Sequence, residues 1–273
     1  MGDDVAVEAV DLVVAYGTHT VLSTATFTVP SGKVTSLVGP NGAGKSSLLN
    51  AIVGLVEPTS GSLSVLGAPA AKVRRRVAYV LQSAKVDEQL PITVRETVVM
   101  GRYAQHGAFG RLTAEDRRAV DLVLDRLDIA DLARRHLHEL SGGQRQRVFV
   151  AQGLVQGADL LLLDEPVTGL DVVSRGVILD VVAAERAAGR TVMMTTHDLA
   201  EASGTDHVLL LAGRVVAAGP PDEVLTTDNL AAAYGGRILR LSDGMVLIDD
   251  PHHHAPGHDH ALCETDDEQV HRH

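Results

Sequence analysis

The hydrophobic and polar positions of this chain follow strand-like patterns at its start and in a series of later runs. Residues 5–14 alternate polar and apolar side chains, and residues 21–29 do so more loosely, which is typical of half-exposed antiparallel strands. Short apolar runs predict buried parallel strands at 34–38, 77–81, 160–163 and 191–195. Two paired runs predict hairpins, the first from 208–211 with 215–218 and the second from 238–241 with 246–248.

Helical periodicity dominates the middle of the chain, between about residues 83 and 155. One helix is predicted to begin with a capping box between Thr113 and Asp116, since apolar residues recur every three to four positions after it. Two further helices are predicted, at 45–54 and 172–188. The strand–helix alternation predicts an α/β fold with a parallel-sheet core, a β-rich opening and a helical insertion.

Past about Asp249 the apolar period is lost, and seven of the thirteen histidines fall in this tail. The sequence therefore predicts one domain over residues 1–248 and a disordered tail over 249–273. The other histidines are scattered, and we expect His106, His136, His138 and His207 to be ordinary surface residues.

The composition of the 273-residue chain excludes several classes of function. The formal net charge of −11 argues against a nucleic-acid partner, which normally requires a basic face. The single Cys263 cannot form an intramolecular disulfide and suits a reducing compartment. The acidic start does not resemble a signal peptide, and no apolar run is long enough to cross a bilayer. We therefore expect a cytoplasmic chain whose membrane role requires a partner.

A phosphate-binding pattern stands between the predicted strand 34–38 and the helix after it. Residues 39–46 read GPNGAGKS, in which glycines allow backbone N–H groups to surround phosphate oxygens. Lys45 is predicted to reach the β- and γ-phosphates of ATP, and Ser46 to supply an oxygen to Mg²⁺. The predicted nucleotide-binding residues here are Gly39, Pro40, Asn41, Gly42, Ala43, Gly44, Lys45, Ser46 and Ser47.

Residues 160–165 read LLLLDE, an apolar strand that delivers two acids to the edge of a sheet. Asp164 is the predicted metal-side carboxylate, since Mg²⁺ prefers oxygen ligands. Glu165 is predicted to orient and deprotonate the attacking water.

Residues 140–144 read LSGGQ, and Ser141 is expected to cap a helix that begins at Gly142. With this motif in place, the chain resembles an ABC-type nucleotide-binding domain over roughly residues 5–240. The resemblance implies a P-loop NTPase of the α/β class with a mixed-sheet core and an antiparallel β subdomain. It also implies a helical subdomain at about residues 84–155.

The resemblance assigns further roles. Tyr16 would stack on adenine, and Gln82, at the end of the 77–81 strand, would touch Mg²⁺ and link the site to the helical subdomain. Asp171 would couple two facing sites, and His197 would contact the γ-phosphate. The family acts as a dimer, so the signature residues of one copy would complete the ATP site of the other; they are Ser141, Gly142, Gly143 and Gln144.

Several segments resemble the zinc and manganese importer branch of this family, namely 90–103, 144–150 and 232–236. Residues 168–171 read TGLD, where that branch often has GVD. This resemblance implies a bacterial importer ATPase at the cytoplasmic face of the membrane. Its partners would be a separate permease, a second copy of the chain and, indirectly, an extracytoplasmic solute-binding protein.

Three alternatives stay open. The same ATPase could serve another cargo, such as a siderophore, haem or an organic solute. A soluble ABC ATPase of DNA repair or translation is disfavoured, because no long coiled coil, zinc module or second cassette is apparent. The tail could bind Zn²⁺ or only solubilise the chain, and its candidate ligands are His252, His253, His254, His258 and His260.

Overall fold

The computed structural model describes residues 4–81, 91–106, 111–235, 238–240 and 246–248. The chain divides into two units, Met1–Gly236 and Arg237–His273. The second unit contributes one described hairpin, made by β11 (Ile238–Arg240) and β12 (Val246–Ile248). The hairpin confirms the last strand pair predicted from the sequence.

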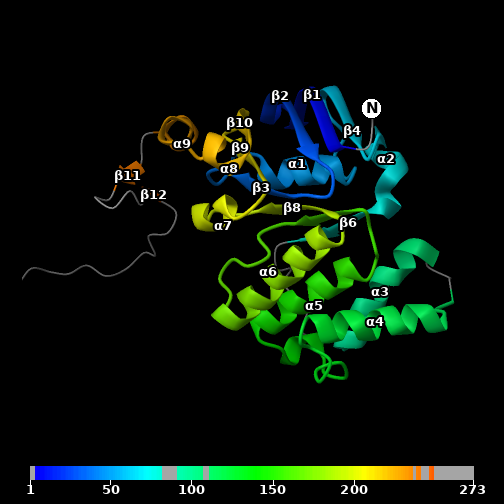
Figure 1. Ribbon diagram of the computed structural model, residues 1–273. Helices are drawn as coiled ribbons and strands as arrows, with labels where there is room; N and C mark the ends of the chain where they lie inside the picture. Colours follow the sequence, from blue (N-terminus) through cyan, green and yellow to red (C-terminus); the bar gives the residue numbers. More distant parts are fainter. Residues whose placement is uncertain (1–3, 82–90, 107–110, 236–237, 241–245, 249–273) are drawn as a thin grey trace, which may run out of the picture. The chain divides into compact units, whose positions relative to one another are not determined.

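A six-stranded sheet forms the centre of the first unit, in the order β10-β9-β3-β8-β7-β6 (Figure 1). The sheet is mixed, since only β10 runs antiparallel to its neighbour. All four predicted buried strands and the predicted hairpin are present: β3 (Val34–Val38), β6 (Val77–Val80), β7 (Leu160–Leu163), β8 (Thr191–Thr195), β9 (His207–Leu211) and β10 (Val215–Gly219).

Alternate residues of the central strands face two separate hydrophobic cores. In β7, Leu160 and Leu162 belong to one core, and Leu161 and Leu163 to the other. Apolar residues on both faces explain why these strands read as continuous apolar runs rather than as alternating patterns.

The first core lies under an antiparallel sheet in the order β2-β1-β4-β5. Its strands are β1 (Val5–Tyr16), β2 (His19–Pro30), β4 (Ser60–Val65) and β5 (Ala68–Pro69), and a short helix α2 (Ala70–Val73) follows. Helix α1 (Lys45–Ile52) lies between this sheet and the central sheet, with Leu48, Leu49 and Ile52 buried in the core (Figure 1). The alternation at the start of the chain predicts β1 and β2; β4 and β5 were not predicted.

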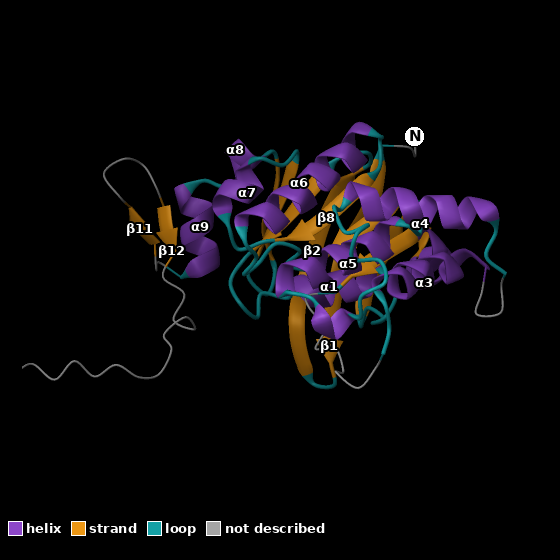
Figure 2. Ribbon diagram, turned by 90° about the horizontal axis from the view of Figure 1, so that it is seen from below, coloured by secondary structure: helices purple, strands orange, loops and turns teal. Residues whose placement is uncertain are grey.

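The second core is covered by helices. They are α3 (Val94–His106), α4 (Ala114–Arg126), α5 (Gly142–Leu154) and α6 (Val172–Ala187). Helices α3 and α4 lie side by side (Figure 2). The predicted capping box of α4 is confirmed, because Thr113 Oγ1 accepts from the Asp116 N–H and the Asp116 carboxylate accepts from the Thr113 N–H. Helices α3, α4 and α5 lie within the helical insertion predicted at about residues 84–155, of which residues 91–106 and 111–155 are described.

The first unit also has three short α-helices, α7 (Leu199–Ser203), α8 (Pro221–Val224) and α9 (Thr227–Tyr234), and two 3-10 helices, Arg74–Arg76 and Leu137–Glu139. Across the described ranges, no helix has the length and apolar character that a membrane span requires.

Of the four histidines expected at the surface, His106 and His138 are exposed, and His136 and His207 are half-buried. His207 begins β9 and is half-buried, and burial lowers the pKa of its imidazole. His106 Nε2 lies 3.0 Å from Oδ1 of the buried Asp116, which also pairs with Arg102. The surface prediction is therefore confirmed for His106 and His138 and wrong for His136 and His207, because the sequence pattern around a single residue does not reveal how it packs in the fold.

Candidate functional site

The turn between β3 and α1 holds its glycines in conformations that other residues rarely adopt. Gly42 and Gly44 have φ angles of 79° and 93°, and Gly39 has a φ of 154°. A Cβ on Gly39 would lie 2.1 Å from the carbonyl oxygen of Leu211, and one on Gly44 would lie 2.8 Å from that of Val21. Close backbone approach therefore requires glycine at positions 39 and 44.

The N-terminus of α1 has no side-chain cap. Gly44 occupies the N-cap position, and the first turn holds no acidic residue. Beside this helix end lies a cavity of about 300 Å³, lined by residues 41–47 together with Val21 and Glu165. Uncapped N–H groups at the positive end of a helix form a suitable site for phosphate oxygens.

Lys45 is 8% exposed, and its ammonium lies inside the turn. Its Nζ donates to the carbonyl oxygens of Gly39 at 2.7 Å and Pro40 at 3.1 Å. The turn therefore places a positive charge beside the N–H groups of α1, as the phosphate-binding prediction requires.

Two acids stand at the end of β7. Asp164 is 6% exposed, and its Oδ1 accepts from Thr195 Oγ1 at 2.7 Å. The Thr195 hydroxyl in turn accepts from the Glu165 N–H at 2.7 Å. Glu165 has a φ of 47° and lines the cavity, so a left-handed backbone at this residue brings its carboxyl group to the phosphate-binding turn.

Two residues that hold Asp164 were not predicted from the sequence. Thr195 is fully buried at the end of β8 and fixes both acids through one hydroxyl. Tyr79, on β6, has its hydroxyl 3.4 Å from Asp164 Oδ2, and burial together with the Asp164 charge raises its pKa. The only sequence signal for Thr195 was its position as a polar residue at the end of an apolar strand. Tyr79 had no such signal, because the order of the strands in the sheet is not visible in the sequence.

The signature residues form the N-terminus of α5. The prediction that Ser141 caps this helix is confirmed: its Oγ accepts from the Gln144 N–H at 3.3 Å, and Gln144 Oε1 accepts from the Ser141 N–H at 3.1 Å. None of residues 141–144 lines the phosphate-binding cavity of their own chain.

Gly143 packs against the start of α6. A Cβ there would lie 2.4 Å from Ser174 Oγ and 2.6 Å from Asp171 Oδ2. Asp171 is the N-cap of α6, and its Oδ1 accepts from the Ser174 N–H at 2.8 Å. That hydrogen bond, joined by others from the same turn, lowers the pKa of the Asp171 carboxyl group. The structure thus brings two predicted site segments together, residues 141–144 and Asp171.

The other predicted residues are spread around this arrangement. His197 is exposed between β8 and α7, and Tyr16 is 47% exposed at the end of β1. Gln82 and the tail histidines His252, His253, His254, His258 and His260 lie outside the described residues. Within the described ranges, no group of three or more His, Cys, Asp or Glu side chains is arranged to hold a metal ion.

Comparison with known proteins settles the family. The model of the ABC transporter family matches residues 22–168, which include the phosphate-binding turn, the signature segment and both acids at the end of β7. The chain belongs to the ABC transporter family. The match covers more than half of the chain and includes the helices inserted between β6 and β7.

Relatives of this ABC subunit have about 40% identity to it. A manganese transport system ATP-binding protein of Bacillus subtilis is 40% identical over 241 residues, which cover 88% of this chain and 96% of the relative. A zinc transport system ATP-binding protein of Treponema pallidum is 41% identical, covering 85% and 88%. A chelated iron transport system membrane protein of Yersinia pestis is 37% identical, covering 85% and 80%.

Solved structures agree with the fold of the ABC subunit. An ABC transporter described as metal-chelate type, in an inward-facing conformation, has a TM-score of 0.75 at 27% identity, covering 85% of this chain and 90% of that one. An ATP-binding subunit of an ABC transporter has a TM-score of 0.71 at 29% identity, covering 85% and 94%.

Membership of the family establishes the general activity. This ABC subunit is an ATPase that binds ATP and Mg²⁺, and it works as a dimer together with a membrane permease. Its association with the membrane is therefore peripheral, through that permease.

Proposed function

We propose that this ABC ATPase powers the import of a divalent transition metal, zinc or manganese. The observation that carries the proposal is the similarity to relatives named for manganese and zinc transport, at 40% and 41% identity over at least 85% of the chain. An importer requires an extracytoplasmic solute-binding protein and an ATPase on the cytoplasmic face of the membrane, and we place the chain there.

In the proposed ATP site, the phosphates occupy the cavity at the N-terminus of α1. Lys45 is the buried cation next to it and supplies charge-assisted hydrogen bonds to the β- and γ-phosphates. Gly39 and residues 41–44 supply backbone N–H groups, and Pro40 between them has none. Ser47 lines the cavity from the first turn of α1, and Tyr16 stacks on adenine. Glu165, which lines the cavity, is positioned to accept a proton from the attacking water, and His197 contacts the γ-phosphate.

The donors near the cavity suit Mg²⁺, a hard cation that takes oxygen ligands. Ser46 offers a hydroxyl in the cavity lining, and Asp164 offers a buried carboxylate fixed by Thr195. With Gln82, these residues would hold the ion, which neutralises phosphate charge when bound. Thr195 and Tyr79 support this arrangement by keeping the Asp164 carboxylate in place.

The signature residues act on the second copy in this proposal. The N-terminus of α5 lies away from the phosphate-binding cavity of its own chain, as expected of a segment that completes the partner's site. Ser141, Gly142, Gly143 and Gln144 would therefore contact ATP bound at Lys45 of the other copy. Asp171, packed against Gly143, would couple the two sites.

The tail forms a separate proposal. Its histidines and acids are a suitable ligand set for Zn²⁺, and they would buffer the metal near the permease.

A test of the proposed cargo compares zinc and manganese contents of the native host carrying wild-type chain, Lys45→Ala or the control Lys33→Ala. Lys33 is half-exposed and lies 4.0 Å from Asp206, away from the phosphate-binding turn. Under chelation, Lys45→Ala should lower one of the two metals severalfold, and Lys33→Ala should leave both unchanged.

A strain truncated before Pro251 separates the tail from the ATPase. A loss of the same metal in this strain would make the tail part of transport. If both metals stay at wild-type levels in the Lys45→Ala strain, the metal proposal is wrong, although the chain remains an ABC ATPase of another cargo.

A further inference from the structure

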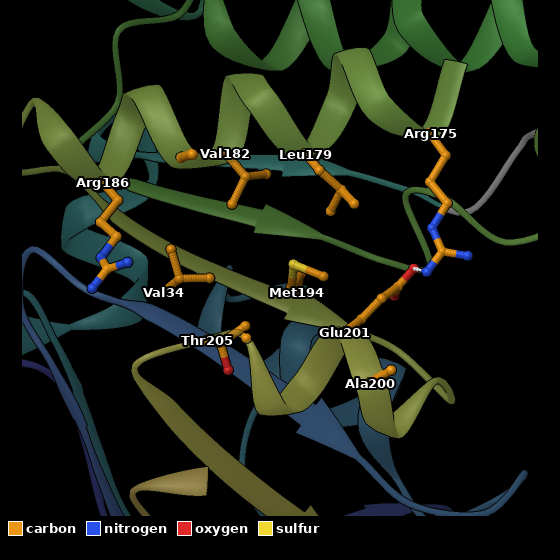
Figure 3. A pocket seen from close by; sticks show the side chains of 11 residues that line it. Val34, Arg175, Leu179, Val182, Arg186, Met194, Ala200, Glu201 and Thr205 are labelled. Atoms are coloured by element: carbon orange, nitrogen blue, oxygen red, sulfur yellow. Dashed lines mark ion pairs between the residues drawn. The ribbon is translucent and has the colours of Figure 1, made fainter. Parts of the chain in front are cut away.

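A second cavity, of about 390 Å³, lies between α6 and α7 over the strands β3 and β8 (Figure 3). Its floor is apolar, and an arginine of α6 stands at each end, Arg175 and Arg186. Because open space separates the two helices here, apolar packing in the cavity cannot by itself fix α7 against α6. The ion pairs that Arg175 and Arg186 make at the two ends of the cavity therefore help to hold α6 against the neighbouring segments.

The bridge at the Arg175 end joins α6 to the start of α7. Arg175 lies 2.9 Å from Asp198 Oδ2 and 2.9 Å from Glu201 Oε1, the second of which is visible in Figure 3. The Glu201 side chain is 6% exposed, so one guanidinium balances two carboxylates, one of them almost fully buried. Removing the cation would leave two neighbouring negative charges without compensation.

The same two carboxylates fix the backbone on either side of His197. Before it, Thr196 donates its hydroxyl to Glu201 Oε2 at 2.6 Å. After it, the Asp198 N–H donates to Thr196 Oγ1 at 3.0 Å, and Asp198 Oδ1 accepts from the Ala200 and Glu201 N–H groups. His197 itself is exposed, so this network determines where its ring can reach.

We propose that Arg175 is a positioning residue for His197, holding the segment 196–198 at the start of α7 through Asp198 and Glu201. The inference rests on the γ-phosphate role proposed for His197. Arg175 also stands one turn after Asp171 on α6, so it joins the two segments that carry Asp171 and His197. Through these ion pairs, a movement of α6 near Asp171 is transmitted to the segment 196–198.

Arg186 offers a matched control on the same helix. It pairs with Asp206, whose other oxygen accepts from the Val34 N–H at the start of β3. It lines the same cavity and is of similar exposure, 48% against 42% for Arg175. Its partner holds β3 rather than the segment around His197.

The test measures ATP hydrolysis, ATP affinity and melting temperature of the full-length chain. The variants are Arg175→Ala, Arg175→Lys, Arg186→Ala, His197→Ala and the Arg175→Ala/His197→Ala double variant. Because misplacing a reacting group by about 1 Å can cost roughly a hundredfold in rate, kcat should fall at least about tenfold in Arg175→Ala, with KM and ATP affinity within about twofold. Arg175→Lys should recover most of the loss, and Arg186→Ala should keep wild-type kcat.

The double variant tests whether Arg175 acts through His197. Adding Arg175→Ala to His197→Ala should lower kcat by less than about twofold, since residues acting as a unit are not additive. Additive losses, or an equal loss in Arg186→Ala, would overturn the inference. If the melting temperature of Arg175→Ala is well below that of the wild type, Glu201→Gln is measured in its place. An unchanged kcat in Glu201→Gln would also overturn the inference. Full activity of His197→Ala would refute the role of His197 itself, and with it the role of Arg175.

Discussion

The N-termini of α1 and α5 both contain glycines, but only the N-terminus of α5 has a side-chain cap. Helix α1 has Gly44 at its N-cap and no side-chain cap, and Lys45 follows at once. Helix α5 has Ser141 at its N-cap, and Ser141 and Gln144 close a full capping box. The first helix end lines the phosphate-binding cavity of its own chain, and the second does not line that cavity.

The difference in capping indicates which kind of binding site each helix end suits. Uncapped N–H groups beside a buried ammonium form a complete anion site within one chain. A capped helix end is already stable, so it can be exposed until a second copy brings a ligand to it. In the dimeric ATPase, we therefore expect the first arrangement to bind the nucleotide and the second to contact nucleotide that is bound to the other copy.

Among the predicted changes, replacing Lys45 should have the largest effect, because it weakens ATP binding at the N-terminus of α1. Lys45→Ala removes the buried cation and should weaken ATP binding to the isolated chain about 100-fold, or about 2.7 kcal/mol. Lys33→Ala, which changes a half-exposed lysine, should stay within about twofold of wild type. Titration with a fluorescent ATP analogue measures both. An affinity of Lys45→Ala close to that of Lys33→Ala would contradict this account of the α1 site.

The adjacent glycines of α5 should respond differently to the same substitution. Gly143→Ala would place a Cβ against Ser174 and Asp171, and should lower the free energy of unfolding by about 2 kcal/mol. Gly142→Ala meets open space and should change it by no more than about 0.5 kcal/mol. Urea denaturation measures both variants, and equal losses would show that the packing of α5 on α6 contributes little.

Removing the cap of α5 should have a smaller effect. Ser141→Ala should cost about 1 kcal/mol of stability and leave ATP affinity of the isolated chain unchanged, because the cap does not line the cavity. Thr226→Ala, which removes the cap of α9, is the matched control and should cost a similar amount. ATP hydrolysis separates the two variants, since only Ser141→Ala should lower it. Unchanged hydrolysis in Ser141→Ala would argue against the role of α5 in the partner's site.

The charged cap of α6 should add a small pH dependence that the neutral cap of α5 lacks. The pKa of Asp171 is lowered in the folded state, so its contribution is full above the unfolded value near 4 and is lost as pH falls through the folded value. Asp171→Asn keeps a capping side chain without the charge. Its deficit in unfolding free energy relative to wild type should therefore shrink as pH falls from 5 towards 3. A constant deficit over that range would mean that the carboxylate charge is not what stabilises the cap.

Much of the site could be found from the sequence because its chemistry is local. The turn 39–46, the acids after 160–163 and the cap at Ser141 each depend on neighbours within a few residues, and each lies where expected. Thr195 and Tyr79 could not be found, since they reach Asp164 only because β6 and β8 flank β7 in the sheet.

The sequence by itself determined most of the strands, the longer helices, the family motifs and the order in which they occur, because these depend on periodicity and on short-range backbone chemistry. Only the tertiary structure decided that Gly143 packs on Asp171 and Ser174, and that Arg175 joins α6 to the segment around His197. Those contacts join residues that are adjacent neither in the chain nor in a repeating pattern. They form when the helices are packed on the sheet, where side-chain size and charge meet in space.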